Sequence, residues 1–448
     1  MSLCTVSFKA RRGRTLSAGL IAGCLLGPLA AAAAPPEIPR GQHGEATAEY
    51  QLEELQKLMP QVDLAESPAG FDPVVWAAFI PEDNPLTPER VELGRKLFFD
   101  ARLSDDGSVS CATCHDATRG FTDQIPVSEG IGGQFGKRNA PTVLNTALLQ
   151  TLFWDGRSPT LDHQARLPIL NPIEMGMPNE EAAIKAIRGI PEYEEGFKKA
   201  FGREMNYEDL GKAIGAFERT LVFVDSPFRR FLGGDPGAIS PEAQAGWELF
   251  NGKARCMTCH PMNPSNPLGT DNRFHNVGVS ARHQDFEGLA QQALKAIQED
   301  ASEQKLDELA IGTDMSELGR FMVTGNRADI GSFRTPLILN IGITGPYMHD
   351  GSLATLWDVI DHYNKGGEDN PFLDGGIEPL ALSEEEIDQL VAFLFTLTDV
   401  RFADQNQRLF EAQRAAANEQ RLFRDDAAAQ RRTLPFEQRV MGAQGKPE

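Results

Sequence analysis

Two stretches of the form Cys-x-x-Cys-His constrain this chain more than any other feature. They read CATCH at residues 111–115 and CMTCH at residues 256–260. This spacing places two thiols one helical turn apart, so both can bond the vinyl groups of a haem while the adjacent histidine reaches the iron. We therefore expect two covalently bound haem c groups, attached through Cys111, Cys114, Cys256 and Cys259.

Two other uses of Cys-x-x-Cys fit less well. Structural zinc takes four Cys or His ligands, and a Cys/Cys/His set leaves its tetrahedron incomplete. A dithiol redox motif would need a thioredoxin-like βαβ context, which the sequence lacks. We expect His115 and His260 to be the proximal iron ligands. Any other single histidine is more often a hydrogen-bonded structural residue than an iron ligand.

The same plan surrounds both motifs. TPERVELGRKLFF (87–99) precedes the first and SPEAQAGWELF (240–250) precedes the second. Each begins with a hydroxyl N-cap, a proline and an early glutamate, and each closes on Gly-x-x-Leu-Phe. An apolar helical stripe ends each half: Leu210, Ile214, Phe217 and Leu221 in the first, and Ile387, Leu390, Val391 and Leu394 in the second. We predict an internal duplication.

The predicted fold is mainly α, with two cytochrome c-like haem domains and long irregular loops rich in Gly, Pro and Asn. The predicted parts are an N-terminal extension (35–84), an N-terminal haem domain (85–232), a C-terminal haem domain (233–400) and a charged tail (401–448). An acidic helical insertion interrupts the second domain at about 284–318. We expect the insertion and the tail to be solvated helix or disorder rather than binding surfaces.

Residues 1–34 have the pattern of an export signal peptide. Arg11, Arg12 and Arg14 precede an apolar run that ends in alanines before Pro35. We expect a periplasmic protein, with lipoprotein anchoring at Cys24 as a minor alternative. No later stretch reaches the roughly 18 apolar residues that a membrane span needs.

The charge balance restricts the partners. The chain has 43 basic and 64 acidic residues, a net charge of -21. This balance argues against nucleic acid and anionic membrane surfaces, and it permits a basic partner protein.

Several strings around the motifs resemble one known family. They are LGRKLFFDARLS, VSCATCHD, GKRNAPTVLN, FWDGR, NPIEMGM, AFERTLV, RFHNVGV and FRTPLILNIGITGPYMHDGSLATLWDVIDHYN, followed by the closing helix. In this order, from about Leu93 to Val400, they are similar to the bacterial di-haem cytochrome c peroxidases and their MauG-type relatives.

The resemblance implies roles for particular residues. The N-terminal haem would react with hydrogen peroxide and the C-terminal haem would store or relay electrons. Trp154 would be the electron bridge between them, and Gln164 and Glu174 would line the distal pocket, with Glu174 as the acid/base residue. A calcium ion would be held by Asn139 and the backbone oxygens of Thr344 and Pro346. Taken alone, Glu174 is typical of a surface carboxylate and Trp154 of packing.

Two departures from the family pattern indicate a MauG-like subtype. Many di-haem peroxidases have a switchable histidine ligand where this chain has Ile131, and residues 116–153 contain no His, Met, Cys or Tyr, which leaves Lys137 as the one conceivable ligand there. Tyr363 occupies the place of the usual methionine ligand of the C-terminal haem. A tyrosine oxygen should lower the reduction potential of that haem. The alternatives for this ligand are His362, Met348 and Met322.

The expected function is that of an exported di-haem peroxidase. Electrons would come from a small cytochrome or cupredoxin, or from a protein substrate that is oxidised in a MauG-like way. One alternative is a non-catalytic di-haem electron-transfer cytochrome, which requires both irons to be saturated by protein ligands. Another is a haem sensor or structural partner that uses the insertion and the tail.

Overall fold

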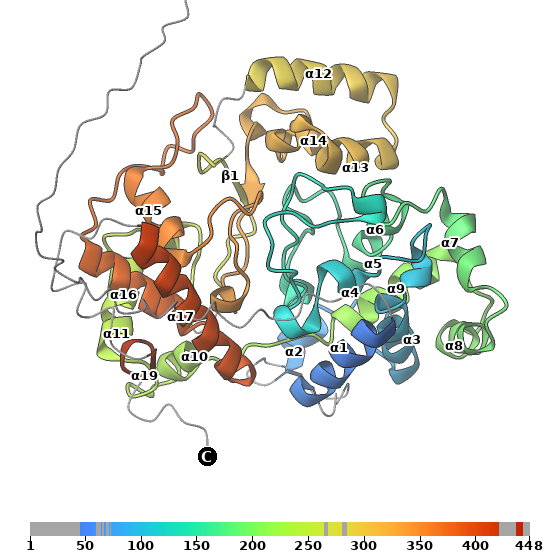
Figure 1. Cartoon of the computed structure of the whole chain (residues 1–448), viewed down its shortest axis with the longest axis horizontal. Coiled ribbons are helices and arrows are strands. Elements are labelled where there is room, and N and C mark those ends of the chain that lie inside the picture. Colours follow the sequence, from blue (N-terminus) through green and yellow to red (C-terminus); the bar gives the residue numbers. More distant parts are fainter. Residues whose placement is uncertain are drawn as a thin grey trace, which may run out of the picture. The chain divides into compact units, whose positions relative to one another are not determined.

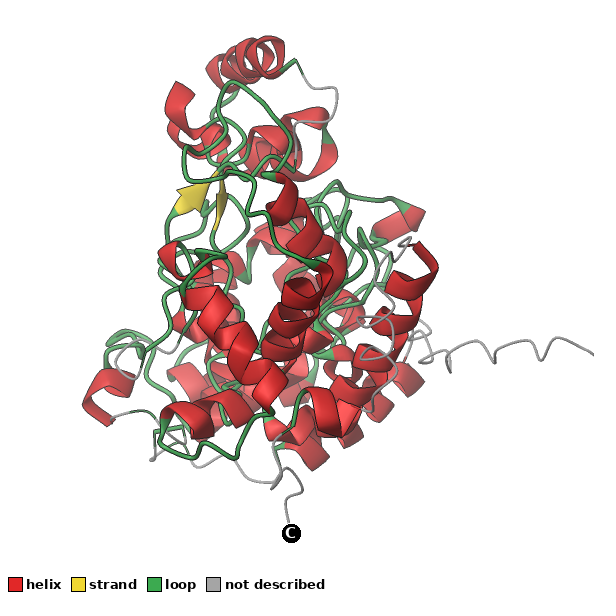
Figure 2. Cartoon of the chain, turned by 90° about the vertical axis from the view of Figure 1, so that its left-hand side faces the viewer, coloured by secondary structure: helices red, strands yellow, loops and turns green. Residues whose placement is uncertain are grey.

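The structure is a computed structural model that describes residues 45–59, 64, 67–68, 71, 73–263, 268–279, 285–420 and 436–441. The predicted signal peptide, its Cys24 alternative and part of the N-terminal extension lie outside these residues. The described chain is mostly helical with long loops (Figure 2), so the prediction of a mainly α fold is confirmed. Strands β1 (Phe274–His275) and β2 (Phe333–Arg334) form a short antiparallel pair.

The helices of the first half of the sequence are drawn in Figure 1, where α10 lies with the helices of the second half. They are α1 (Glu45–Leu58), α2 (Pro73–Ala77), α3 (Pro88–Phe98), α4 (Cys111–Cys114), α5 (Leu161–Gln164), α6 (Leu167–Leu170), α7 (Glu180–Ile187), α8 (Pro191–Phe201), α9 (Tyr207–Glu218) and α10 (Pro227–Leu232). The helices of the second half are α11 (Pro241–Asn251), α12 (Phe286–Glu299), α13 (Glu303–Gly312), α14 (Phe321–Thr324), α15 (Leu356–Lys365), α16 (Glu384–Phe395), α17 (Ala403–Gln420) and α19 (Phe436–Arg439).

A glycine lets two helices cross closely in each half. A Cβ at Gly94 of α3 would lie 1.8 Å from the backbone oxygen of Ala213 in α9. A Cβ at Gly246 of α11 would lie 1.9 Å from the backbone oxygen of Gln389 in α16. Both glycines belong to the Gly-x-x-Leu-Phe strings, so the string marks the position where the leading helix meets the closing helix. The duplication stays a prediction, which these matching crossings support.

The apolar side chains form three buried clusters. One is built mainly from the first half, around Phe98, Phe121 and Phe217, and one mainly from the second half, around Trp357 and Phe393. The third belongs to the insertion and includes residues of α12, α13 and α14, which lie together in Figure 1. The boundaries of the predicted domains stay predictions. No helix among the described residues is long and apolar enough to cross a membrane.

The described part of the insertion is helical, as the solvated-helix reading predicted, but one face of α13 is buried rather than solvated. In α13, Asp307, Leu309, Ala310 and Ile311 are buried. The helix packs against α6 of the first half, and the backbone oxygen of Ile311 accepts a 2.8 Å hydrogen bond from the N–H of Lys137. The sequence did not predict this burial because the segment is acidic in composition, and the contacts that bury one of its faces come from residues far away in the chain.

The described parts of the tail are also helical and partly buried. In α17, Gln413 accepts a hydrogen bond from the backbone of Leu356 and donates one to the hydroxyl of Tyr347, both at 2.8–2.9 Å. In α19, the Arg439 side chain is fully buried and pairs with Glu242 at 2.8 Å. Through these contacts, α19 binds the start of α11 and α17 binds the start of α15.

Candidate functional site

The first motif forms the short helix α4, which begins after Ser110. Nδ1 of His115 lies 3.3 Å from the backbone oxygen of Phe121. A proton on Nδ1 leaves the lone pair on Nε2, as an iron ligand requires. Burial lowers the pKa of His115 to about 4, so its imidazole is neutral at physiological pH. The local fold thus prepares His115 as a metal ligand.

The second motif repeats this arrangement in a 3₁₀ helix over Cys256–Thr258. Nδ1 of His260 lies 2.7 Å from the backbone oxygen of Gly269, and burial lowers its pKa. In both motifs the backbone N–H of the histidine also donates a 2.9 Å hydrogen bond to the carbonyl of the first cysteine. Two histidines with the same backbone support suit the same task, which is axial ligation of a haem iron.

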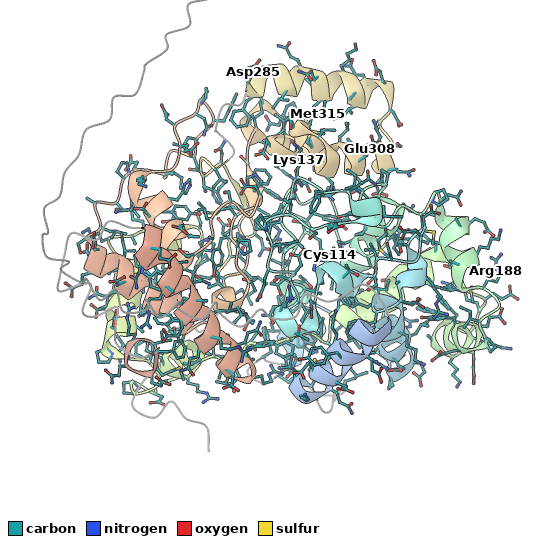
Figure 3. The ribbon with its side chains drawn as sticks, viewed as in Figure 1. Cys114, Lys137, Arg188, Asp285, Glu308 and Met315 are labelled. Atoms are coloured by element: carbon teal, nitrogen blue, oxygen red, sulfur yellow. The ribbon has the colours of Figure 1, made fainter. Side chains whose placement is uncertain are left out.

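A cavity in the first half brings together most of the residues that were predicted there. Its lining includes Cys111, Cys114 (labelled in Figure 3), His115, Asn139, Trp154, Gln164 and Glu174. Three polar atoms of its lining residues are buried and have no hydrogen-bond partner in the described part of the chain: Arg138 Nε, Glu174 Oε2 and Glu218 Oε2. Thiols, a neutral histidine and orphaned polar atoms around one apolar cavity fit a bound haem with charged edges.

Glu174 lies on a tight turn that its neighbours hold in place. The Asn171 side-chain oxygen accepts from the N–H of Ile173 at 2.9 Å, and the Asn171 carbonyl accepts from the N–H of Gly176 at 2.8 Å. Burial raises the pKa of Glu174 to about 8, helped by the nearby Asp307 carboxylate and opposed by Arg157. The turn presents a carboxyl that exchanges its proton near neutral pH.

Ile131 packs against the same turn. A Cβ at Gly176 would lie 2.9 Å from Ile131 Cδ1, and the N–H of Ile131 donates to the Glu174 carbonyl at 2.9 Å. Lys137, the one other candidate ligand of that stretch, is 49% exposed and pairs with Asp314 at 3.1 Å. The segment therefore holds Ile131 against the Glu174 turn, and the lack of a protein ligand from this segment stays a prediction.

Trp154 lies where the two halves meet. Its indole Nε1–H donates a 2.9 Å hydrogen bond to the carbonyl of Asn139. Its own carbonyl accepts a 2.7 Å hydrogen bond from the backbone N–H of Arg334 in β2. Gln164 ends α5, which Thr160 caps by accepting from the N–H of His163 at 3.2 Å. Both side chains belong to the cavity lining.

Tyr363 lies in α15, close enough to the second motif for Cys256 and Cys259 to affect its pKa. Burial, together with those two thiols, raises that pKa. Its neighbour His362 places Nε2 2.8 Å from the carbonyl of Val277. Met322 is 4% exposed inside the cluster of the insertion, and Met348 packs against the cluster of the second half. Tyr363 stays the predicted ligand.

The predicted calcium ligands are partly engaged with other groups. The side-chain amide of Asn139 donates to the carbonyls of Ile125 and Pro126 at 3.0 and 3.2 Å. Its backbone N–H donates 2.8 Å to the carbonyl of His349, which follows the loop that contains Thr344 and Pro346. The oxygen of the Asn139 amide is the atom suited to a cation, and the calcium site stays a prediction.

Histidines outside the motifs have other partners. His275 places Nδ1 2.6 Å from Asp374 and Nε2 3.0 Å from Asp271. Ligand atoms of His275, Asp271 and Cys259 lie within 4.8 Å of one another. Because the second motif commits Cys259 to a thioether and both nitrogens of His275 face carboxylates, we assign no metal to this cluster.

Sequence reasoning missed a buried chain of charges beside the cavity. Arg138 pairs with Asp155 at 2.6 Å, Asp155 with Arg157 at 3.1 Å, and Arg157 with Asp307 at 2.7 Å. Burial alone would raise the pKa of Asp155, but Arg157 and Arg138 hold it at about 2. The FWDGR string contains two of these residues and could have signalled a buried pair. Nothing local indicates Asp307.

Comparisons with known proteins agree with this site. A family model described as di-haem cytochrome c peroxidase matches residues 88–237. The methylamine utilization protein MauG of Methylorubrum extorquens is 39% identical over 319 residues, which cover 71% of this chain and 80% of that relative. The cytochrome c551 peroxidase of Nitrosomonas europaea is 36% identical over 317 residues, which cover 70% of this chain and 82% of that relative.

A solved structure has the same fold. The crystal structure of a MauG-like protein associated with microbial copper homeostasis has 31% sequence identity and a TM-score of 0.59, and the match covers 74% of this chain and 93% of that one. These relatives agree with the two haem motifs and with the neutral, partly buried histidine in each. The chain therefore belongs to the di-haem cytochrome c peroxidase family of oxidoreductases, which includes MauG.

Proposed function

We propose that this chain is an exported, MauG-like di-haem c-type peroxidase that reduces hydrogen peroxide in the cavity of the first half. The observation that carries the proposal is Glu174, whose Oε2 is buried and has no partner among the described residues, in a cavity that it shares with His115. The periplasmic location is part of the proposal and rests on the leader pattern of residues 1–34.

The overall reaction takes two electrons and two protons to each hydrogen peroxide and releases two water molecules. The haem, when bound, supplies the redox chemistry that cleaves the O–O bond. The Oε2 atom of Glu174 accepts a proton from one peroxide oxygen and returns it to the other, a task suited to a carboxyl with a pKa of about 8. The Gln164 amide orients the peroxide by hydrogen bonding, and Ile131, which cannot bind iron, would leave this position open to peroxide.

The second half completes the proposal. Trp154 carries oxidising equivalents across the contact between the halves. Two hydrogen bonds hold it there: its backbone oxygen accepts one from Arg334 of β2, and its indole N–H donates one to the backbone oxygen of Asn139. Tyr363 would bind the iron of the second haem through its phenol oxygen, and Asn139, Thr344 and Pro346 would hold a calcium ion that stabilises the junction. Electrons come from a small cytochrome or cupredoxin, or from a protein substrate that is oxidised.

Electron paramagnetic resonance of the resting ferric protein tests the proposal. We expect one high-spin and one low-spin signal, and both should vanish when peroxide is added. Two low-spin, six-coordinate haems with no peroxide reaction before reduction would contradict it and favour a pure electron carrier. Turnover with a one-electron donor alone indicates peroxide removal, whereas oxidation of a protein partner indicates MauG-like modification.

Site variants sharpen this test. Glu174→Gln removes the proton acceptor and should slow the peroxide reaction by about 10²-fold or more. Glu308→Gln is the matched control. Glu308 (labelled in Figure 3) is a surface residue of the insertion, where it pairs with Lys305 at 3.0 Å. Equal rates for the wild type and Glu174→Gln would remove Glu174 from the mechanism.

A further inference from the structure

Helix α13 belongs to the second half of the sequence but covers the cavity of the first half. Ile311 of α13 is part of the cavity lining. A Cβ at Gly312 would lie 2.4 Å from the Cδ1 atom of Ile173, the residue before Glu174, and a Cβ at Gly136 would lie 3.0 Å from Ile311 Cγ2. The insertion is therefore packed directly against the turn that bears Glu174.

One buried carboxylate of α13 contacts the groups that surround Glu174. The Asp307 side chain is 4% exposed, and its Oδ1 accepts from Arg157 Nε and Nη2 at 2.9 and 2.7 Å. Its other oxygen, Oδ2, accepts from the side-chain amide of Asn171. Both carboxylate oxygens are thus used, one by Arg157 of the cavity lining and the other by Asn171, which precedes the Glu174 turn.

The Asn171 contact continues into the Glu174 turn. With its NH₂ group bound to Asp307, the Asn171 side chain presents its oxygen to the N–H of Ile173 at 2.9 Å. The Asn171 carbonyl accepts the N–H of Gly176 at 2.8 Å. Two hydrogen bonds from Asn171 therefore bracket Glu174, and Asp307 determines how the Asn171 side chain is turned.

The contact with Arg157 fixes the position of a positive charge, that of the Arg157 guanidinium. The Arg157 guanidinium lines the cavity, lies 3.4 Å over the Phe153 ring and also donates to Asp155 at 3.1 and 3.2 Å. Carboxylates bind this guanidinium on two sides, and no hydrogen bond joins it to Glu174 Oε2, which has no partner among the described residues. Without Asp307, the Arg157 guanidinium would lose one of these two carboxylate partners.

We propose that Asp307 is a positioning residue for the acid/base chemistry of Glu174, contributed by the insertion of the C-terminal half. It fixes the Glu174 turn through Asn171 and keeps the Arg157 charge off the Glu174 carboxyl. This inference rests on the proposed peroxidase function. It gives the insertion a role in the reaction and makes the first active site incomplete without the second half.

The charged and titratable groups that act on Glu174 support this reading. Asp307 raises the pKa of Glu174 and Arg157 lowers it. The thiols of Cys111 and Cys114 also interact with Glu174, but they become uncharged thioethers when haem is attached. Replacing Asp307 by asparagine removes the like charge and loosens Arg157, and both changes favour the ionised form of Glu174.

The test uses the holoprotein with two haems. An infrared titration follows the carboxyl C=O band of Glu174, which is assigned by its loss in Glu174→Gln. We expect Asp307→Asn to lower the titration midpoint by about one pH unit and to move the pH profile of the peroxide reaction in the same direction. The rate at the optimum should fall about tenfold because the turn is less well held. Asp307→Glu should give an intermediate midpoint and rate.

Glu308→Gln, the next residue of α13, is the control and should match the wild type in both measurements. A wild type that reacts with peroxide while Asp307→Asn keeps the same midpoint and pH profile overturns the inference. A wild type that does not react with peroxide overturns the proposed function, and the infrared midpoint then still tests the link between Asp307 and Glu174. If Asp307→Asn does not assemble with both haems, Asp307→Glu carries the test, and a midpoint and rate equal to wild type overturn the inference.

Discussion

The indole nitrogen of Trp154 donates a 2.9 Å hydrogen bond to the backbone oxygen of Asn139. The predicted electron bridge is thereby held by the predicted calcium ligand. The backbone N–H of Asn139 in turn donates to His349 of the second half, and the carbonyl of Trp154 accepts from Arg334 of the second half, at 2.8 and 2.7 Å. The orientation of the indole therefore depends on contacts from both halves.

Trp154→Phe tests the bridge. Phenylalanine keeps the packing but loses the N–H donor and the easily oxidised indole, so we expect the peroxide-induced change at the second haem to slow at least tenfold. Loss of the hydrogen bond should cost about 1 kcal/mol of unfolding free energy. Stopped-flow spectroscopy of both haems measures the first effect and urea unfolding the second. Trp247→Phe, in an aromatic cluster with Phe228 and Phe393, is the control. Unchanged kinetics in Trp154→Phe would leave Trp154 with a packing role alone.

Tyr363→Met tests the distal ligand of the second haem. A thioether donates less electron density than a phenolate, so the reduction potential of one haem should rise, by a shift large enough to be clear in a spectroelectrochemical titration. Tyr347→Phe is a suitable control because Tyr347 is also buried, and its hydroxyl is occupied by Gln413 and by the carbonyl of Ile341. Identical potentials in Tyr363→Met and wild type would point instead to His362, Met348 or Met322.

Two buried glutamates predict how stability changes with pH. Burial raises the pKa of Glu174 and of Glu218 to about 8. The unfolded chain releases these protons in the ordinary glutamate range, whereas the folded protein keeps them until about pH 8. Ionisation therefore favours unfolding more strongly as pH rises through this window, and the free energy of unfolding should fall.

Glu174→Gln and Glu218→Gln should each flatten that decline, by on the order of 4 kcal/mol at pH 8. Urea unfolding at several pH values measures the effect, and the surface variant Glu308→Gln should follow the wild-type curve. A wild-type stability that rises between pH 5 and 8 while both variants behave like wild type would show that these carboxyls are ionised in the folded protein.

The helix crossings predict the effect of single methyl groups. Gly94→Ala and Gly246→Ala place a Cβ 1.8 and 1.9 Å from the backbone oxygens of Ala213 and Gln389, so the helices must move apart. We expect each variant to lose about 3 kcal/mol of unfolding free energy, as measured by urea or thermal unfolding. At Gly375 a Cβ would meet nothing within 4 Å, so Gly375→Ala should change little. Wild-type stability in Gly94→Ala would mean that α3 and α9 can separate at no cost.

Much of the architecture follows from local sequence signals. Thr87 and Ser240 cap α3 and α11 as their positions predict, accepting from the N–H of the third residue along at 3.3 and 3.0 Å. Prolines occupy the first turns of both helices, and the Gly-x-x-Leu-Phe strings lie where the helices cross. The caps and the prolines depend on neighbours within a few residues, so the residue types and their spacing are enough to predict them. The crossings themselves bring together residues that are far apart in the chain.

By itself, the sequence determined the two haem motifs, the matching helices that lead into them and the family resemblance from which Trp154, Gln164 and Glu174 were named. The tertiary structure alone decided that Asp307, 133 residues after Glu174 in the numbering, lies beside it, and that Arg439 is buried against Glu242. The physical reason is that a charged residue in a charged segment gives no local sign of burial. Its desolvation is offset only by partners that the folded chain brings from far away.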